Sequence, residues 1–188
     1  MIRTDDMDTT EVLQCAREYA IEHGIEDVIV ASTTGETGAE AARVFDDDER
    51  NLVVVGHSTG YAEPNEQEIA DEHRETIESA GGAVFVGPMV FSNVGRAIAE
   101  QNGSSAHEVV ADVLRLFGQG CKVTLECVLM ACDAGLVDVE KPVLSIAGTG
   151  DGADTVFLIH SANSLDFFDA RVLDVVAKPA DRENLVFY

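Results

Sequence analysis

The chain has 188 residues, of which 35 are acidic and 12 are lysine or arginine, so its formal net charge at pH 7 is −23. This length is enough for one domain with its own core, and a surface of this charge repels nucleic acid and anionic membranes unless salt screens it. Because no apolar run is long enough to span a membrane and the N-terminus lacks the apolar core of a signal peptide, we expect residues 1–188 to form a single cytoplasmic domain.

The first half of the chain predicts alternating helices and strands. Asp8 and Glu11 form a capping box, and apolar residues at helical spacing follow until Gly24. Residues 52–56 are apolar throughout, as in a strand that is covered on both faces. The expected elements are a helix ending at Gly24, a strand over 27–32, a helix over 38–45, a strand over 52–56, a charged helix ending at Gly81 and a strand over 83–86.

The second half predicts three helices followed by three strands. The helix over residues 121–134 is apolar nearly all round, which indicates burial on more than one side. The strands over 155–160 and 172–177 are close in sequence, so we expect an antiparallel ending on an otherwise parallel sheet. The other elements are a short helix to Gln101, a helix opening at Ser105 and a strand over 143–147. This pattern predicts a three-layer α/β/α domain with the loops after strands 27–32, 52–56 and 143–147 at one sheet edge.

The charge balance is typical of a protein from a salt-rich cytoplasm. Only three residues are lysines, and the acids are scattered except for the run at residues 46–49. At molar salt the Debye length is roughly 3 Å, so self-repulsion largely vanishes. We interpret the chain as halophilic, and the alternative is an ordinary acidic protein.

The four cysteines, Cys15, Cys121, Cys127 and Cys132, are expected to be free thiols, because nothing else in the sequence indicates secretion. Three of them lie in one predicted helix, where they are too far apart or face different ways to hold one zinc ion. The five histidines also lack metal-ligand spacing, so no metal is expected.

The turn between the strand at 27–32 and the next helix is the first candidate site. It contains Ser32, Thr33, Thr34, Gly35, Thr37 and Gly38. Backbone N–H groups and hydroxyls at a helix N-terminus suit a phosphate, although Glu36 adds a repelling charge. No Gly-Lys-Ser/Thr follows, so this is not a Walker A loop. The alternative is a plain turn whose hydroxyls cap the helix.

Two further polar loops follow strands. Gly148, Thr149 and Gly150 begin a loop that resembles a dinucleotide fingerprint only superficially, because a strand and not a helix comes next. His57, Ser58 and Thr59 lie in a Gly-x-Ser-x-Gly sequence, but a loop follows where a nucleophile elbow needs a helix. Serine hydrolysis is therefore disfavoured, and we interpret these three residues as a polar rim for a ligand.

Lys122 and Glu126 are spaced i, i+4 on the apolar helix and therefore face the same way. They form either a surface ion pair or a site in which Lys122, at the start of the helix, lies beside the ligand. The sequence leaves both readings open.

Four stretches of the chain resemble one protein family. They are Ser32-Thr33-Thr34-Gly35, Phe117-Gly118-Gln119-Gly120-Cys121-Lys122-Val123-Thr124-Leu125-Glu126, Leu129-Met130-Ala131-Cys132-Asp133-Ala134-Gly135-Leu136, and Ser145-Ile146-Ala147-Gly148-Thr149-Gly150-Asp151-Gly152-Ala153-Asp154-Thr155. With them the chain resembles stand-alone archaeal and bacterial proteins that are similar to the C-terminal α/β domain of pyruvate kinase. The resemblance implies a three-layer sandwich with a mixed sheet of about five strands, the last of them antiparallel.

The same resemblance implies a role in ligand binding. The corresponding domain of allosteric pyruvate kinases carries no catalytic residues, holds a sugar phosphate between two loops that match residues 32–38 and 148–154, and joins subunits. It also raises FMN as a possible ligand. Since the catalytic barrel is absent, pyruvate kinase activity is not expected. We therefore expect a homo-oligomer that binds a small phosphorylated compound; the alternatives are an enzyme that uses a bound flavin or the polar cleft, and a structural or regulatory subunit.

Overall fold

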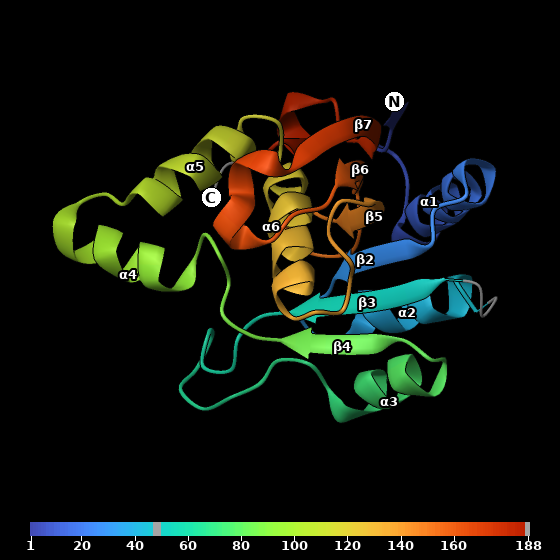
Figure 1. Ribbon diagram of the computed structural model, residues 1–188, viewed down its shortest axis with the longest axis horizontal. Coiled ribbons are helices and arrows are strands. Elements are labelled where there is room, and N and C mark those ends of the chain that lie inside the picture. Colours follow the sequence, from blue (N-terminus) through green and yellow to red (C-terminus); the bar gives the residue numbers. More distant parts are fainter. Residues whose placement is uncertain (47–49, 187–188) are drawn as a thin grey trace.

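The structure is a computed structural model that describes residues 1–46 and 50–186, so most of the predicted acidic run, residues 47–49, lies outside the described residues. Its centre is a seven-stranded sheet of order β1-β7-β6-β5-β2-β3-β4 (Figure 1). The strands are β1 (Ile2–Arg3), β2 (Asp27–Ala31), β3 (Asn51–Gly56), β4 (Ala83–Val86), β5 (Pro142–Ala147), β6 (Thr155–His160) and β7 (Arg171–Lys178).

All neighbouring strands pair in parallel except at β6, which runs antiparallel to both β5 and β7. The predicted α/β fold class is confirmed, and antiparallel pairing does occur near the end of the chain. The reversed strand is however β6, whereas the last strand, β7, runs in the same direction as β5. The sheet has seven strands where about five were expected, and one of the additional strands, β1, is only two residues long. Two residues are too few to show the alternation of apolar and polar side chains that marks a strand in a sequence. Only the pairing of β1 with β7 therefore defines it as a strand.

The described residues also form six α-helices and two short 3₁₀ segments. They are α1 (Thr9–His23), α2 (Glu36–Val44), α3 (Asp71–Ser79), α4 (Asn93–Asn102), α5 (Ala106–Arg115), α6 (Gln119–Asp133), η1 (Ser164–Asp169) and η2 (Arg182–Asn184). The capping box at Asp8 is formed as predicted, and Gly24 ends α1 in the left-handed conformation. No helix in this described part is long and apolar enough to cross a membrane.

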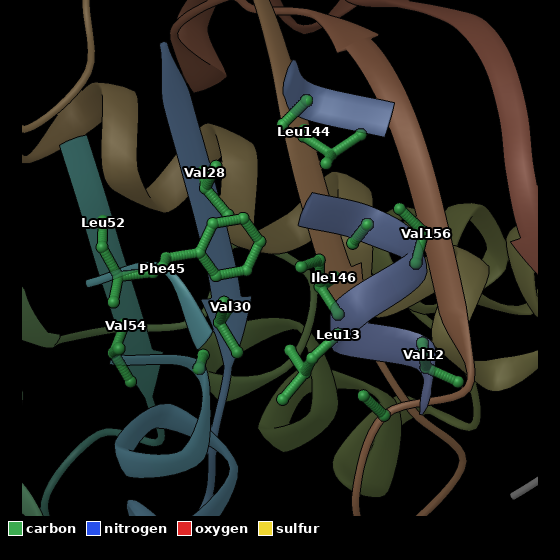
Figure 2. Close-up of a cluster of buried hydrophobic side chains, with 14 of the residues drawn as sticks. Val12, Leu13, Val28, Val30, Phe45, Leu52, Val54, Leu144, Ile146 and Val156 are labelled. Carbon is green, nitrogen blue, oxygen red and sulfur yellow. The ribbon is translucent and has the colours of Figure 1, made fainter. Parts of the chain in front are cut away.

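Two hydrophobic clusters lie on opposite faces of the sheet because side chains alternate along each strand. Val28 and Val30 of β2 face α1 and α2, as Figure 2 shows together with Val12 and Leu13. Ile29, between them in sequence, packs in the other cluster with residues of α6. This double burial explains why the central strands are apolar throughout.

Helix α6 is the main element on the second face. Most of its side chains are buried, including Cys121, Cys127 and Cys132, and it packs against β2, β3, β5 and β6 as well as α5 and η1. The prediction that it is covered on more than one side is therefore confirmed. The four cysteines are free, as expected, although Cys15 is only partly buried.

The two ends of the described chain are joined through Asp5. Its carboxylate accepts hydrogen bonds from the N–H groups of Ala180 (3.0 Å) and Asp181 (2.8 Å), from the Asn184 amide and from Arg3. These donors, led by the Asp181 N–H, lower the pKa of Asp5 well below the ordinary value of 3.8. Charged Asp5 therefore stabilises the fold above the pKa that it has in the unfolded chain.

We expect Asp5→Ala to lower the free energy of unfolding at neutral pH and to lose less stability on acidification than the wild type. The contribution of Asp5 is present above about pH 4 and disappears as the pH falls further, because the folded pKa is the lower one. Urea unfolding at neutral pH and near pH 3 measures both effects. Exposed Asp6 provides the matched control, and Asp6→Ala should leave both values unchanged. Equal losses in the two variants would contradict the prediction.

Candidate functional site

A cleft of about 740 Å³ lies at the carboxyl ends of β2, β3 and β5. Because these strands are parallel, the loops that follow them meet at one edge of the sheet, as the sequence predicted. The far wall comes from α4, α5 and one face of α6. The lining residues are Ala31, Ser32, Thr33, Thr34, Thr37, Val55, Gly56, His57, Tyr61, Met89, Ser92, Arg96, Glu108, Arg115, Gln119, Lys122, Val123, Glu126, Cys127, Met130, Gly148, Gly150, Asp151 and Gly152.

The cleft brings together most of the predicted site residues, from all four predicted segments. Those that line it are Ser32, Thr33, Thr34, Thr37, His57, Lys122, Gly148 and Gly150; those that do not are Gly35, Gly38, Ser58, Thr59 and Thr149. The two glycine-containing loops, which are more than 100 residues apart in sequence, therefore face one space.

The turn between β2 and α2 uses some of its hydroxyls to cap the helix. Ser32 Oγ accepts a hydrogen bond from the Gly38 N–H (3.1 Å), and Thr34 Oγ1 accepts a longer one from the Glu36 N–H (3.4 Å). The capping alternative is thus correct for Ser32 and Thr34. The hydroxyls of Thr33 and Thr37 make no hydrogen bond to another described residue, which leaves them available to a ligand. Glu36 is exposed and does not line the cleft.

In the loop after β5, a carboxylate of the loop itself already accepts hydrogen bonds from neighbouring loop residues. Asp154 accepts hydrogen bonds from the Thr149 N–H (2.9 Å) and from the Thr155 hydroxyl (2.5 Å). Gly148 is required by the loop itself, because a side chain there would collide with the carbonyl of Gly152. Close approach of a ligand is therefore not needed to explain this glycine. Asp151 of the same loop lines the cleft.

The loop after β3 forms one rim. His57 Nδ1 lies 2.9 Å from a Glu68 carboxylate oxygen, and its ring packs on Tyr61 with centroids 4.3 Å apart. Ser58 Oγ instead accepts a hydrogen bond from the Asn93 side chain (2.9 Å). The chain continues as a loop until α3 begins at Asp71, so the local structure of a nucleophile elbow is absent there.

A buried ion pair contributes to the α6 wall of the cleft. The side chains of Lys122 and Glu126 are each only 4% exposed and contact each other directly. Lys122 Nζ also donates to Ser92 Oγ (3.2 Å), and Glu126 accepts from the Phe91 N–H (2.7 Å). The i, i+4 pairing is confirmed, but the surface reading is wrong, because α5 and the ends of the strands cover this part of α6.

Two arginines in the cleft were not predicted from the sequence. Arg115 is largely buried, pairs with Asp112 (2.8 Å) and donates to Gln119 (2.9 Å). Arg96 is more exposed and pairs with Glu100 (3.2 Å). Both lie on helices that the sequence predicted, but helical spacing alone does not show which neighbour the polar side chains will meet.

Apolar side chains complete the cleft. Met89, Val123 and Met130 line it, the latter two from α6. Cys127 of α6 lines it too, and burial raises the pKa of its thiol far above neutrality, so the thiol stays protonated and is a poor nucleophile. Within residues 1–46 and 50–186, no group of three or more His, Cys, Asp or Glu side chains is arranged to hold a metal ion.

No protein-family model matches the chain. Among solved structures, a Cryptosporidium parvum pyruvate kinase in complex with ADP is similar over 82% of this chain and 24% of the kinase, with 12% identity and a TM-score of 0.44. A second structure of a pyruvate kinase from that organism covers 82% of this chain and 23% of the kinase, with 14% identity and a TM-score of 0.43. An O-ureido-L-serine synthase covers 52% of this chain and 31% of the synthase, with 22% identity and a TM-score of 0.32. The chain thus spans less than a third of the length of each of these proteins, and similarities this distant do not establish a shared activity.

Proposed function

We propose that the cleft binds a small phosphorylated compound, with FMN and sugar phosphates as the candidate ligands, and that the domain has no pyruvate kinase activity. The observation that carries this proposal is a concentration of cations. Arg96, Arg115 and Lys122 line one cleft, although the whole chain has only 12 lysine and arginine residues. Thr33 and Thr37, whose hydroxyls make no hydrogen bond within residues 1–46 and 50–186, line the same space.

The balance of charges inside the cleft differs from that of the whole molecule. Its three lysine and arginine side chains are matched by three carboxylates, those of Glu108, Glu126 and Asp151. The remainder of the surface is strongly acidic and repels anions. The cleft therefore repels an anion less than the acidic remainder does, and the guanidinium of Arg115 suits a phosphate as a charged hydrogen-bond donor.

The size and the apolar wall fit an organic phosphate better than a free phosphate ion. A volume of about 740 Å³ falls within the range typical of small-molecule sites. Met89, Val123 and Met130 offer an apolar surface for a ring system, while the hydroxyls and cations suit the phosphate end. These residues fit FMN, which would supply redox chemistry when bound, and the chain's own residues would bind and orient it.

An enzyme that uses a bound flavin or the polar cleft remains the second candidate. The buried Lys122–Glu126 pair favours it, because a lysine held at the wall of a cleft can act on a bound substrate. This candidate predicts turnover that is lost in Thr34→Ala while circular dichroism shows that the fold survives. It predicts the same loss in Lys122→Ala, for which circular dichroism must also show that the chain folds without the buried partner of Glu126.

We expect Arg115→Met to weaken binding of FMN or a sugar phosphate by about 10-fold or more, because a hydrogen bond to a charged group is removed. Isothermal titration calorimetry with FMN, a sugar phosphate and inorganic phosphate measures this, and visible absorbance detects any flavin that co-purifies. Arg74, paired with Glu78 on α3 outside the cleft, is the matched control, and Arg74→Met should bind as the wild type does. Failure of all three ligands to bind, or equal affinity in the two variants, would overturn the proposal.

A further inference from the structure

The negative charge of the chain is distributed unevenly. Residues 80–125 contain three acidic residues, Glu100, Glu108 and Asp112, and three basic ones, Arg96, Arg115 and Lys122. This segment is therefore neutral, and the rest of the chain carries the whole net charge of −23. Helices α4 and α5 lie entirely within the neutral segment and project from the body of the molecule as an arm (Figure 1).

The arm exposes apolar side chains. Val94, Leu116 and Phe117 are 70%, 71% and 62% exposed, although residues of these types are usually buried. With them we define the arm surface as Val94, Ile98, Val109, Val113, Leu116 and Phe117, all of which are exposed. Val94 and Ile98 form one i, i+4 pair on α4, and Val109 and Val113 form another on α5.

Helix α5 has a second apolar face that is already used. Ala111 is buried, and Val110 and Leu114 pack with it against Phe91 and Leu129. The exposed Val109 and Val113 are therefore not needed for the contact between α5 and the rest of the molecule. A helix that is apolar on two sides is normally covered on both, and α4 packs mainly against α5 rather than the sheet.

We propose that the arm surface is the interface of a symmetric dimer of this chain. Two arms meet as neutral, apolar surfaces, whereas a contact between the acidic parts of two chains would be opposed by charge repulsion. A twofold axis presents the same residues from both sides, and an apolar surface is complementary to itself. This arrangement also leaves the two acidic bodies outside the contact. Anionic lipid and nucleic acid are repelled by the adjacent charge, and a basic protein would favour the acidic remainder.

Light scattering coupled to size exclusion tests the dimer with the full chain. The wild type should have about twice the mass of the 20.1 kDa chain. The double variant Val113→Asp/Leu116→Asp should weaken association by at least about 30-fold, as expected for central interface residues. The control is Ile21→Asp, which places a charge on an exposed apolar residue of α1 and should leave the mass unchanged.

Hydrogen exchange of the wild type provides a readout that does not depend on a variant folding correctly. Amides in residues 93–117 should exchange more slowly at high protein concentration than at low concentration, whereas those of α1 should not change. A wild type that is monomeric at every concentration would overturn the proposal, as would a dimer that persists in the folded double variant. Binding of the monomer to neutral or anionic lipid vesicles, lost in the double variant, would overturn it in favour of a membrane surface.

Discussion

Replacing Glu126 with leucine is expected to lower the free energy of unfolding by about 3–5 kcal/mol, because it leaves the charge of Lys122 buried without a counter-ion. Both side chains are only 4% exposed, so water can replace the missing partner only in part. The variant also removes the acceptor of the Phe91 N–H. Urea unfolding followed by circular dichroism measures the loss, and Glu126→Gln separates the two effects because its amide oxygen can still accept from Phe91.

The double variant Lys122→Met/Glu126→Leu should recover most of this loss. Replacing a whole buried pair with apolar residues of similar volume avoids both the unpaired charge and the cost of removing two charges from water. A double-mutant cycle should therefore show strong coupling between the two positions. A Glu126→Leu variant as stable as the wild type, or a double variant less stable than either single one, would show that the pair is not buried in solution.

The second large effect concerns salt. We expect the free energy of unfolding to rise strongly between low salt and molar KCl, because 35 acidic residues repel one another in the folded chain. At 1 M salt the Debye length falls to roughly 3 Å, which screens most of this repulsion. Thermal unfolding across a KCl series measures the change, and an equimolar non-ionic solute such as sucrose controls for excluded-solute effects.

A variant with less negative charge should need less salt. Glu18, Glu22 and Glu75 are exposed and lie on helices outside the cleft. Converting all three to lysine should raise stability at low salt and flatten the dependence on KCl. If stability does not depend on salt, or if the triple variant has the same dependence as the wild type, the halophilic interpretation is wrong and the chain is an ordinary acidic protein.

The proposed ligand site and the proposed dimer surface share structural elements. Arg96 lies on α4 and Arg115 at the end of α5, and both helices also carry the arm surface. Failure of ligand binding and failure of dimer formation are nevertheless distinguishable, because light scattering requires no ligand and calorimetry can be performed on the monomeric double variant.

Local patterns in the sequence were sufficient to predict most elements of the fold. The capping box at Asp8 acts within one helical turn, and the apolar run of β3 reports burial on both faces directly. Parallel strands joined by helices then place the ends of β2, β3 and β5 at one edge, so the position of the cleft followed from topology alone. Among the described strands, only β1 was not predicted, because its two residues are ordered by partners 175 positions away.

The chemistry of the cleft depended on contacts between distant residues. The sequence predicted that Lys122 and Glu126 face the same way, since helical spacing determines this, but their burial depends on what packs over α6. Arg96 and Arg115 reach the cleft only because α5 packs against α6 and α4 packs against α5. Asp154 accepts a hydrogen bond from the Thr149 N–H across the turn of its own loop. The sequence by itself determined which helices and strands form and at which edge the polar loops gather. Only the tertiary structure decided which charges line the cleft, because burial and pairing depend on packing between segments that local patterns do not connect.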